Sequence, residues 1–200
     1  TELDQRLRID PATRAQALVK FGLSLDRPVL ALCPGAEFGE SKRWPAEHYA
    51  QVAETRIRQG WQVWLFGSKK DHPVGEEIRQ RLIPGLREEA TNLSGETSLA
   101  EAIDLMSCSD AVVSNDSGLM HVAAALNRPL VAVYGSTSPG FTPPLAEQVE
   151  VVRLGLDCSP CFDRTCRFGH YNCLRLLEPQ RVDTALALLQ LPVAVDLPGE

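Results

Sequence analysis

Two patterns of apolar positions alternate along this chain. Short, nearly all-apolar runs are typical of strands covered on both faces of a sheet, and segments with apolar residues three or four positions apart are typical of amphipathic helices. The short runs predict about six strands, at residues 29–33, 61–66, 111–113, 129–134 and 149–154, with a short strand and turn within residues 91–95. The periodic segments predict about six helices, over residues 11–21, 45–58, 73–82, 98–106, from 118 onward and over 179–189.

This alternation of strands and helices predicts an α/β fold, a Rossmann-like doubly wound parallel sheet. The sequence has no internal repeat, low-complexity tract or linker, so we expect one domain over residues 1–200. Ligands of such folds bind outside the carboxyl ends of the strands. We expect loops with unusual sequences to meet there, at residues 34–44, 67–72, 114–118 and 135–144.

The charge balance narrows the choice of partner. The chain has 20 Lys and Arg against 26 Asp and Glu, a net charge of −6, which argues against a nucleic acid or an anionic membrane surface as the main partner. No apolar run approaches the roughly 20 residues that span a bilayer, and no signal peptide opens the chain. We therefore expect a soluble, cytoplasmic protein. Because the chain begins with Thr1 and residues 1–10 lack a strand pattern, we also expect a piece of a longer protein.

The most informative stretch is SNDSGLMHVAAA, residues 114–125, where a strand, a polar turn and a helix follow one another. A helix start presents unpaired N–H groups and the positive end of the helix dipole, which favours phosphates. Ser117, Gly118 and His121 are therefore candidate phosphate contacts, although a lone His on an apolar helix is often only a packed residue. Asp116 would repel a phosphate, so we expect it to cap the helix or to bind sugar hydroxyls.

The loop after the first strand, PGAEFGESKRWP, is the second candidate. Gly35 and Gly39 allow the backbone to approach a ligand, and Lys42 supplies a mobile positive charge for a diphosphate. Ser41 beside it is a candidate substrate contact. Taken alone, the loop also fits an exposed charged turn, but a second candidate loop at the same sheet edge favours phosphate binding.

The third candidate region follows the second strand. Ser68 and two acidic residues, Asp71 and Glu76, stand where Rossmann-type proteins place the group that binds ribose hydroxyls. Acidic residues are also common at helix starts for electrostatic reasons. Residues 92–97 fit either a base pocket or a plain turn. The sequence has neither GxGxxG nor a P-loop signature, so ordinary NAD and ATPase functions lack support.

Together, CPGAEFGESKRWP and NDSGLMHVAAALNRPLVAVYGSTSPGFTPP resemble the ADP-heptose:lipopolysaccharide heptosyltransferases of glycosyltransferase family 9, and are most similar to the heptosyltransferase II branch. The resemblance covers most of residues 29–144 and continues more loosely to the last helix. It implies a GT-B fold with two Rossmann-like domains, of which this chain would be the C-terminal, donor-binding half. The acceptor-binding N-terminal domain would lie outside it.

The resemblance also implies roles for individual residues. Lys42 is similar to the lysine that contacts the diphosphate and sugar, and Asp116 to the acid that holds the heptose. Ser117, Gly118 and His121 match positions around the phosphates. The ribose-binding acid stays open between Asp71 and Glu76.

The implied reaction is the inverting transfer of heptose from ADP-heptose to the inner core of lipopolysaccharide, with no metal or other cofactor. Lys42 and the helix-start N–H groups would stabilise the charge of the leaving ADP. No residue is an obvious base for the acceptor, so this chain alone would bind ADP or ADP-heptose and transfer little. The resemblance implies a location at the cytoplasmic face of the inner membrane, with peripheral association possible.

The six cysteines fall into two groups. Cys33 and Cys108 lie in apolar segments and are expected to be reduced core residues. The other four stand close together with His170 in CSPCFDRTCRFGHYNC, and this clustering fits a zinc or iron–sulfur site as well as a cysteine-rich loop without metal. Their spacing matches no common zinc pattern, which favours the loop. These four are Cys158, Cys161, Cys166 and Cys173.

Two other functions are compatible with this fold. One is a different GT-B nucleotide-sugar enzyme, such as a UDP-N-acetylglucosamine 2-epimerase, which would prefer UDP to ADP. The other is a binding module without catalysis, which would be indifferent to Lys42 and Asp116.

Overall fold

The computed structural model describes residues 7–37, 39–140 and 146–194 and contains one six-stranded parallel sheet. Its strand order is β3-β2-β1-β4-β5-β6, and every neighbouring pair is parallel. The strands are β1 (Val29–Cys33), β2 (Gln62–Leu65), β3 (Ala90–Asn92), β4 (Ala111–Asn115), β5 (Leu130–Val133) and β6 (Val149–Val152). The predicted doubly wound sheet is confirmed.

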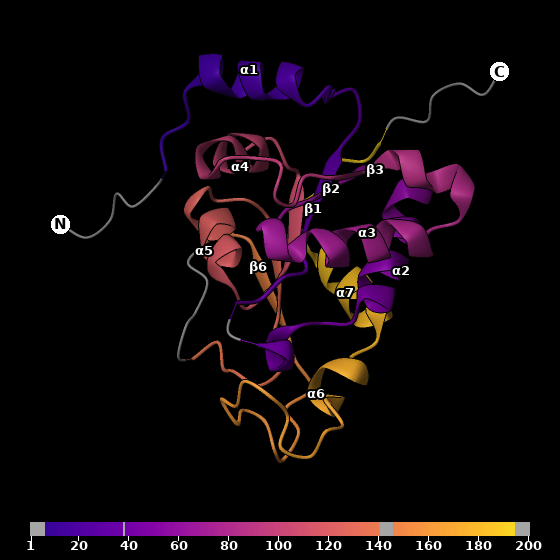
Figure 1. Cartoon of the computed structure of the whole chain (residues 1–200), viewed down its shortest axis with the longest axis vertical. Coiled ribbons are helices and arrows are strands. Elements are labelled where there is room, and N and C mark those ends of the chain that lie inside the picture. The colour runs from indigo at the N-terminus through magenta and orange to yellow at the C-terminus, as the bar shows by residue number, and fades with distance from the viewer. Residues whose placement is uncertain (1–6, 38, 141–145, 195–200) are drawn as a thin grey trace.

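Helices cover both faces of this sheet (Figure 1). On one face lie α1 (Pro11–Lys20), α4 (Leu99–Met106) and α5 (Gly118–Ala125), and on the other lie α2 (Ala46–Arg58), α3 (His72–Arg81) and α7 (Pro179–Leu188). The short helix α6 (Asn172–Arg175) lies with the cysteine-rich segment beyond one end of the sheet. Three 3-10 helices complete the elements: η1 (Glu40–Lys42), η2 (Lys69–Asp71) and η3 (Pro84–Glu89).

The alternation of side chains along each strand builds two cores. In β1 all five residues are buried; Leu30 and Leu32 pack toward α2 and α7, whereas Ala31 and Cys33 pack toward α4 and α5. This two-sided burial explains why the strands are almost entirely apolar. Cys33 is buried, as expected, and burial raises the pKa of its thiol to about 12.

Local signals place the helix ends. Ser98 and Glu101 form the capping box that begins α4, as the sequence predicts. The short strand and turn predicted within residues 91–95 are confirmed, since β3 ends at Asn92 and the chain then turns. α6 and the 3-10 helices have no counterpart among the predictions, because each is too short for a hydrophobic period to show. Among the described residues, no helix has the length and apolarity needed to cross a membrane.

The order of the strands creates a switch point in the middle of the sheet. From β1 the chain proceeds outward to β2 and β3, then returns to β4 on the other side of β1 and continues to β5 and β6. Cys33 at the end of β1 is in register with Ser114 near the end of β4. The loops after β1 and β4 therefore diverge from one place, which is where open α/β sheets bind ligands.

Candidate functional site

A cavity of about 630 Å³ lies at this switch point, within the size range of small-molecule sites. It is bounded by the loops after β1, β2 and β4 and by the first residues of α4 and α5. Most of the predicted site residues line it: Lys42, Ser68, Asp71, Asp116, Ser117, Gly118 and His121. Ser41 and Glu76 are not among the lining residues.

Lys42 and Asp116 form an ion pair in the cavity wall. The Lys42 Nζ lies 3.1 Å from the Asp116 Oδ2, and the exposed fractions of the two side chains are only 15% and 5%. The hydroxyl of Thr137 donates a hydrogen bond to the same Oδ2. The positive charge of Lys42 therefore offsets the carboxylate, which reduces the repulsion that Asp116 would exert on a bound phosphate.

The start of α5 faces the same cavity. Ser117 occupies the N-cap position with extended backbone and makes no side-chain cap hydrogen bond, and Gly118 is the first helical residue. Asp116 therefore does not occupy the capping position that was one of its two expected roles. His121, one turn into the helix, is exposed and lines the cavity. Helix-start N–H groups, Lys42 and His121 thus converge on one space, an arrangement suited to a phosphate.

Asn115, the last residue of β4, fixes the loop that carries Lys42. Its side chain is fully buried and its Oδ1 accepts hydrogen bonds from the Trp44 N–H at 3.1 Å and the Tyr49 hydroxyl at 2.7 Å. Its Nδ2 donates to the carbonyl oxygens of Pro34 at 2.6 Å and Gly35 at 3.5 Å. One amide therefore ties both ends of the 34–44 loop to the strand that precedes Asp116.

Asp71 lies between Gly35 and Gly67 and lines the cavity together with the loop after β2. Its Oδ2 accepts hydrogen bonds from the Ser68 N–H at 2.8 Å and the Ser68 hydroxyl at 3.0 Å. A Cβ at Gly35 or at Gly67 would overlap the Asp71 side chain, so glycine is required at both positions for this close approach. Asp71 and Ser68 are thus positioned by the loop itself and line the cavity together.

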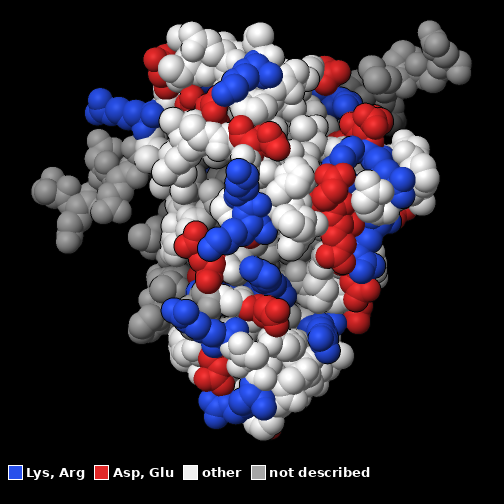
Figure 2. Space-filling model, viewed as in Figure 1, with Lys and Arg blue, Asp and Glu red and all other residues white. Residues whose placement is uncertain are grey.

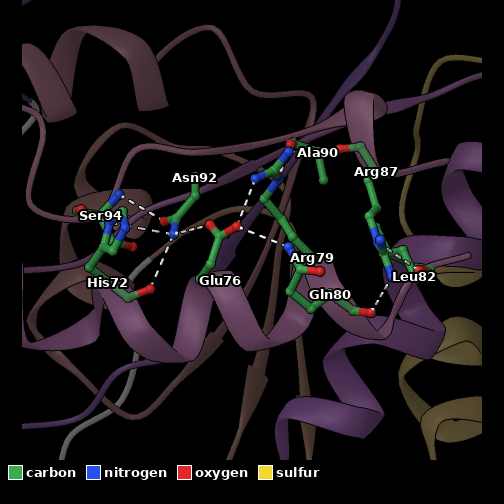
Figure 3. A network of polar contacts seen from close by, with 9 residues as sticks. All are labelled: His72, Glu76, Arg79, Gln80, Leu82, Arg87, Ala90, Asn92 and Ser94. Atoms are coloured by element: carbon green, nitrogen blue, oxygen red, sulfur yellow. Dashed lines mark hydrogen bonds and ion pairs between the residues drawn. The ribbon is translucent and has the colours of Figure 1, made fainter. Parts of the chain in front are cut away.

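Glu76 belongs to a different, half-buried network that joins α3 to β3 (Figure 3). Its carboxylate accepts hydrogen bonds from Arg79 at 2.9 Å and from Asn92 at 3.3 Å. Partial burial raises the pKa of Glu76, but hydrogen bonds from Asn92 and Gln80 and the charges of Arg79 and His72 outweigh it and hold the pKa below its usual value. Of the two candidate ribose-binding acids, the structure brings only Asp71 to the cavity. Of the turn at residues 92–97, Thr97 lines the cavity while Asn92 joins the network of Glu76.

Ser41 is buried behind the cavity wall. Its hydroxyl donates a hydrogen bond to the Asp163 carbonyl and accepts one from the Ser136 hydroxyl at 3.0 Å. Its placement gives it contacts with the protein rather than with the cavity.

The four clustered cysteines are partly buried free thiols. Among the described residues, no group of three or more His, Cys, Asp or Glu side chains is arranged to hold a metal ion. The Cys166 sulfur accepts hydrogen bonds from the backbone N–H groups of Tyr171, Phe168, His170 and Gly169, which lower the pKa of this thiol. Burial, followed by the negative charges of the other three thiolates, raises the pKa of Cys173 to about 11.

Several residues that shape the site were not among the sequence candidates. Asn115 and Thr137 are not singled out by sequence, because their partners lie far away along the chain. Leu99 and Ala102 at the start of α4 add an apolar wall to the cavity. Leu99 is 68% exposed, which is unusual for a large apolar side chain and marks it as a candidate ligand contact once the fold is known. On the face shown in Figure 2, positive and negative side chains are interspersed, in keeping with the modest net charge.

Comparison with known proteins agrees with this geometry. The sequence model of glycosyltransferase family 9 (heptosyltransferase) matches residues 1–172. Lipooligosaccharide heptosyltransferase 2 of Haemophilus influenzae is 57% identical over 152 residues, which are 74% of this chain and 44% of that protein. Lipopolysaccharide heptosyltransferase 2 of Escherichia coli is 46% identical over 177 residues, 88% of this chain and 51% of that protein.

The fold of this chain is also similar to that of a solved heptosyltransferase structure. The structure of E. coli ADP-heptose lps heptosyltransferase II superposes with a TM-score of 0.81 at 46% identity, covering 91% of this chain and 52% of that chain. The chain spans about half the length of these curated relatives. Because the family model matches most of the sequence, the chain belongs to glycosyltransferase family 9, the heptosyltransferase family.

Proposed function

We propose that this chain is the donor-binding half of a heptosyltransferase II that moves heptose from ADP-heptose to the inner core of lipopolysaccharide. The observation that carries the proposal is the convergence of Lys42, Asp116 and the start of α5 on one cavity at the switch point of the sheet. Membership of the family and the names of the relatives supply the reaction. All the relatives reported above are heptosyltransferases, so the 2-epimerase alternative gains no support.

In this proposal the diphosphate lies against the N–H groups at Ser117, Gly118 and Leu119. Lys42 shifts its ammonium from Asp116 toward the bridging phosphate oxygens as the glycosidic bond breaks and ADP gains negative charge. Groups fixed beforehand where this charge develops lower the barrier, because they need not reorganise during the reaction. Asp116, released from Lys42, accepts hydrogen bonds from heptose hydroxyls, and His121 adds a contact to phosphate.

The nucleoside lies on the opposite side of the cavity. Asp71 is the acid available to ribose hydroxyls, and the apolar wall of Leu99 and Ala102 suits the face of adenine. Glu76 is left out of the donor site, because its carboxylate is engaged on the surface of α3.

Acceptor binding and the activation of the acceptor hydroxyl are assigned in this proposal to a second domain. We propose that an N-terminal Rossmann-like domain faces this cavity in a GT-B arrangement, binds the lipopolysaccharide acceptor and supplies the base that activates its hydroxyl. Transfer then proceeds with inversion at the anomeric carbon. The expected location is the cytoplasmic face of the inner membrane, where the acceptor would be reached by peripheral association.

Calorimetric titration of this chain with ADP and with UDP tests the proposal. Selective binding of ADP, with tighter binding of ADP-heptose that depends on Asp116, supports a donor site for ADP-heptose. Preference for UDP would favour the 2-epimerase alternative, and binding unchanged by Lys42→Ala and Asp116→Ala would favour a module with another function.

A further inference from the structure

We propose that the cysteine-rich segment, residues 158–173, is a support that positions Lys42, and that Ser41 is the positioning residue through which the support acts. The functional part of this inference rests on the proposed role of Lys42 in binding the donor diphosphate. Its structural part stands on contacts between two segments that are more than a hundred residues apart along the chain.

Ser41 joins three segments through every polar group it has. Its N–H donates to the Arg164 carbonyl at 3.3 Å, and its hydroxyl donates to the Asp163 carbonyl. The Ser136 hydroxyl donates to the Ser41 Oγ at 3.0 Å, and the Ser136 N–H donates to the Ser41 carbonyl at 3.3 Å. With 2% of its surface exposed, Ser41 is a buried junction immediately before Lys42.

Glu40 in η1 and Gly39 just before it also contact the cysteine-rich segment. The Tyr171 hydroxyl donates a hydrogen bond to the Glu40 Oε2 at 3.2 Å. Gly39 precedes η1 with a φ of 151°, and a Cβ there would overlap the Arg164 carbonyl oxygen. The backbones of the two segments are therefore in direct contact at Gly39, and a residue with a side chain would prevent this contact.

The support reaches the partner of Lys42 as well. The Phe162 N–H donates to the Ser136 carbonyl at 2.7 Å, and the Ser159 hydroxyl donates to the Gly135 carbonyl. Ser136 is followed by Thr137, whose hydroxyl holds the Asp116 carboxylate. The same segment thus fixes the backbone on both sides of the Lys42–Asp116 pair.

Such a support is needed because η1 has little stability of its own. A three-residue 3-10 helix is a single turn with poor hydrogen-bond geometry, and short helices take their stability from packing. Lys42 has a long, flexible side chain, so the position of its ammonium depends on how firmly its Cα is held. A displacement of about 1 Å at a reacting group can reduce a rate by roughly a hundredfold.

This inference gives the cysteine-rich segment a function that does not require a bound metal. Its backbone groups and the hydroxyls of Ser159 and Tyr171 provide the contacts, and none of the contacts described above involves a thiol. It also gives Ser41 a role different from the direct substrate contact expected from the sequence, because its hydroxyl faces Asp163 and Ser136.

The test compares Ser41→Ala with Ser109→Ala in this chain. Ser109 is equally buried and its hydroxyl donates to the Met106 carbonyl at 2.6 Å, but it precedes β4 at the opposite end of the strand. Ser41→Ala removes two hydrogen bonds of a buried serine hydroxyl and Ser109→Ala removes one, so both variants should lose stability, and Ser109→Ala controls for that general loss at a place far from Lys42. Ser136→Ala, which removes one of the hydroxyl's partners, is a milder second variant.

The first readout is hydrogen–deuterium exchange of the ligand-free chain. We expect Ser41→Ala to raise amide exchange in residues 40–43 by about tenfold and Ser136→Ala by less, with no change there in Ser109→Ala. Equal exchange of residues 40–43 in all variants would overturn the support, whether or not a nucleotide binds.

The second readout is the affinity for ADP-heptose by calorimetry. We expect a loss of about fivefold to tenfold in Ser41→Ala and none in Ser109→Ala. Looser exchange with unchanged affinity would confirm the support and contradict its link to the donor site. A wild-type chain that binds neither ADP nor ADP-heptose would count against the proposed function, while the exchange measurement would still decide the support.

Discussion

Asp116 determines the electrostatics of the cavity at the scale of single residues. Its side chain is nearly inaccessible to water, and an unpaired carboxylate in such a place would be costly by several kcal/mol. Lys42 and Thr137 satisfy it in the ligand-free protein. The ion pair keeps Lys42 oriented toward the cavity before a donor arrives, which limits the side-chain ordering that binding must cause.

Removing Lys42 should therefore weaken donor binding more than the loss of a surface charge would. We expect Lys42→Ala to lower the affinity for ADP-heptose by about tenfold or more, since a charge-assisted contact is lost and Asp116 is left uncompensated. Lys70→Ala is the matched control, because Lys70 is an exposed lysine in η2 at the same sheet edge but not in the cavity wall. Calorimetry measures both, and equal affinities in the two variants would exclude this role.

The thiols also differ from one another residue by residue. Backbone N–H groups lower the pKa of Cys166, whereas burial raises the pKa of Cys173 to about 11 and that of Cys33 to about 12. The thiolate is the nucleophile, so at pH 7.5 iodoacetamide should label Cys166 well before Cys173 and Cys33. Mass spectrometry of peptides follows the labelling. Cys166→Ser should remove this fast labelling, and faster labelling of Cys173 would contradict the environments described.

At the scale of elements, the loop after β1 is held from two directions. Asn115 fixes its ends to β4, and Ser41 joins its middle to the cysteine-rich segment. A loop that is fixed in this way keeps its shape without a ligand. This rigidity suits a phosphate site, where groups fixed in advance bind better than mobile ones.

The contribution of Asn115 can be measured against that of one of its partners. We expect Asn115→Ala to lower the free energy of unfolding by about 2–4 kcal/mol, because several buried groups lose their partner at once. Tyr49→Phe removes a single hydroxyl that donates to Asn115 at 2.7 Å and should cost about 1 kcal/mol. Denaturant unfolding gives both values, and similar losses in the two variants would contradict the central place of Asn115.

The elements also show how far the sequence predicts this structure. Short apolar runs predicted β1 and β4, and the Ser98–Glu101 spacing predicted the capping box of α4, because these signals are local in the sequence. α6 and η1 were missed because one turn carries no periodic signal. The roles of Ser41, Glu76 and Asn115 depend on partners brought near by the fold, so the local sequence could suggest their polarity but not their contacts.

At the scale of the whole molecule, the strand order brings the separate signals together. Loops from β1, β2 and β4 and the starts of two helices meet at the switch point, although they are distributed over residues 35–122 of the chain. The cavity is thus a consequence of topology. The parallel order made its position predictable from sequence, whereas its apolar wall and buried ion pair required the structure.

An NMR titration of this 21.9 kDa chain with ADP-heptose, followed through its backbone amide signals, locates the donor site without any substitution. A donor site at the switch point predicts saturable shifts concentrated at residues 35–37, 67–68, 97–99 and 117–122, with little change in α7 on the other face of the sheet. Shifts centred on α7 or on the network around Glu76, or no shifts at saturating donor, would contradict a donor site at the switch point.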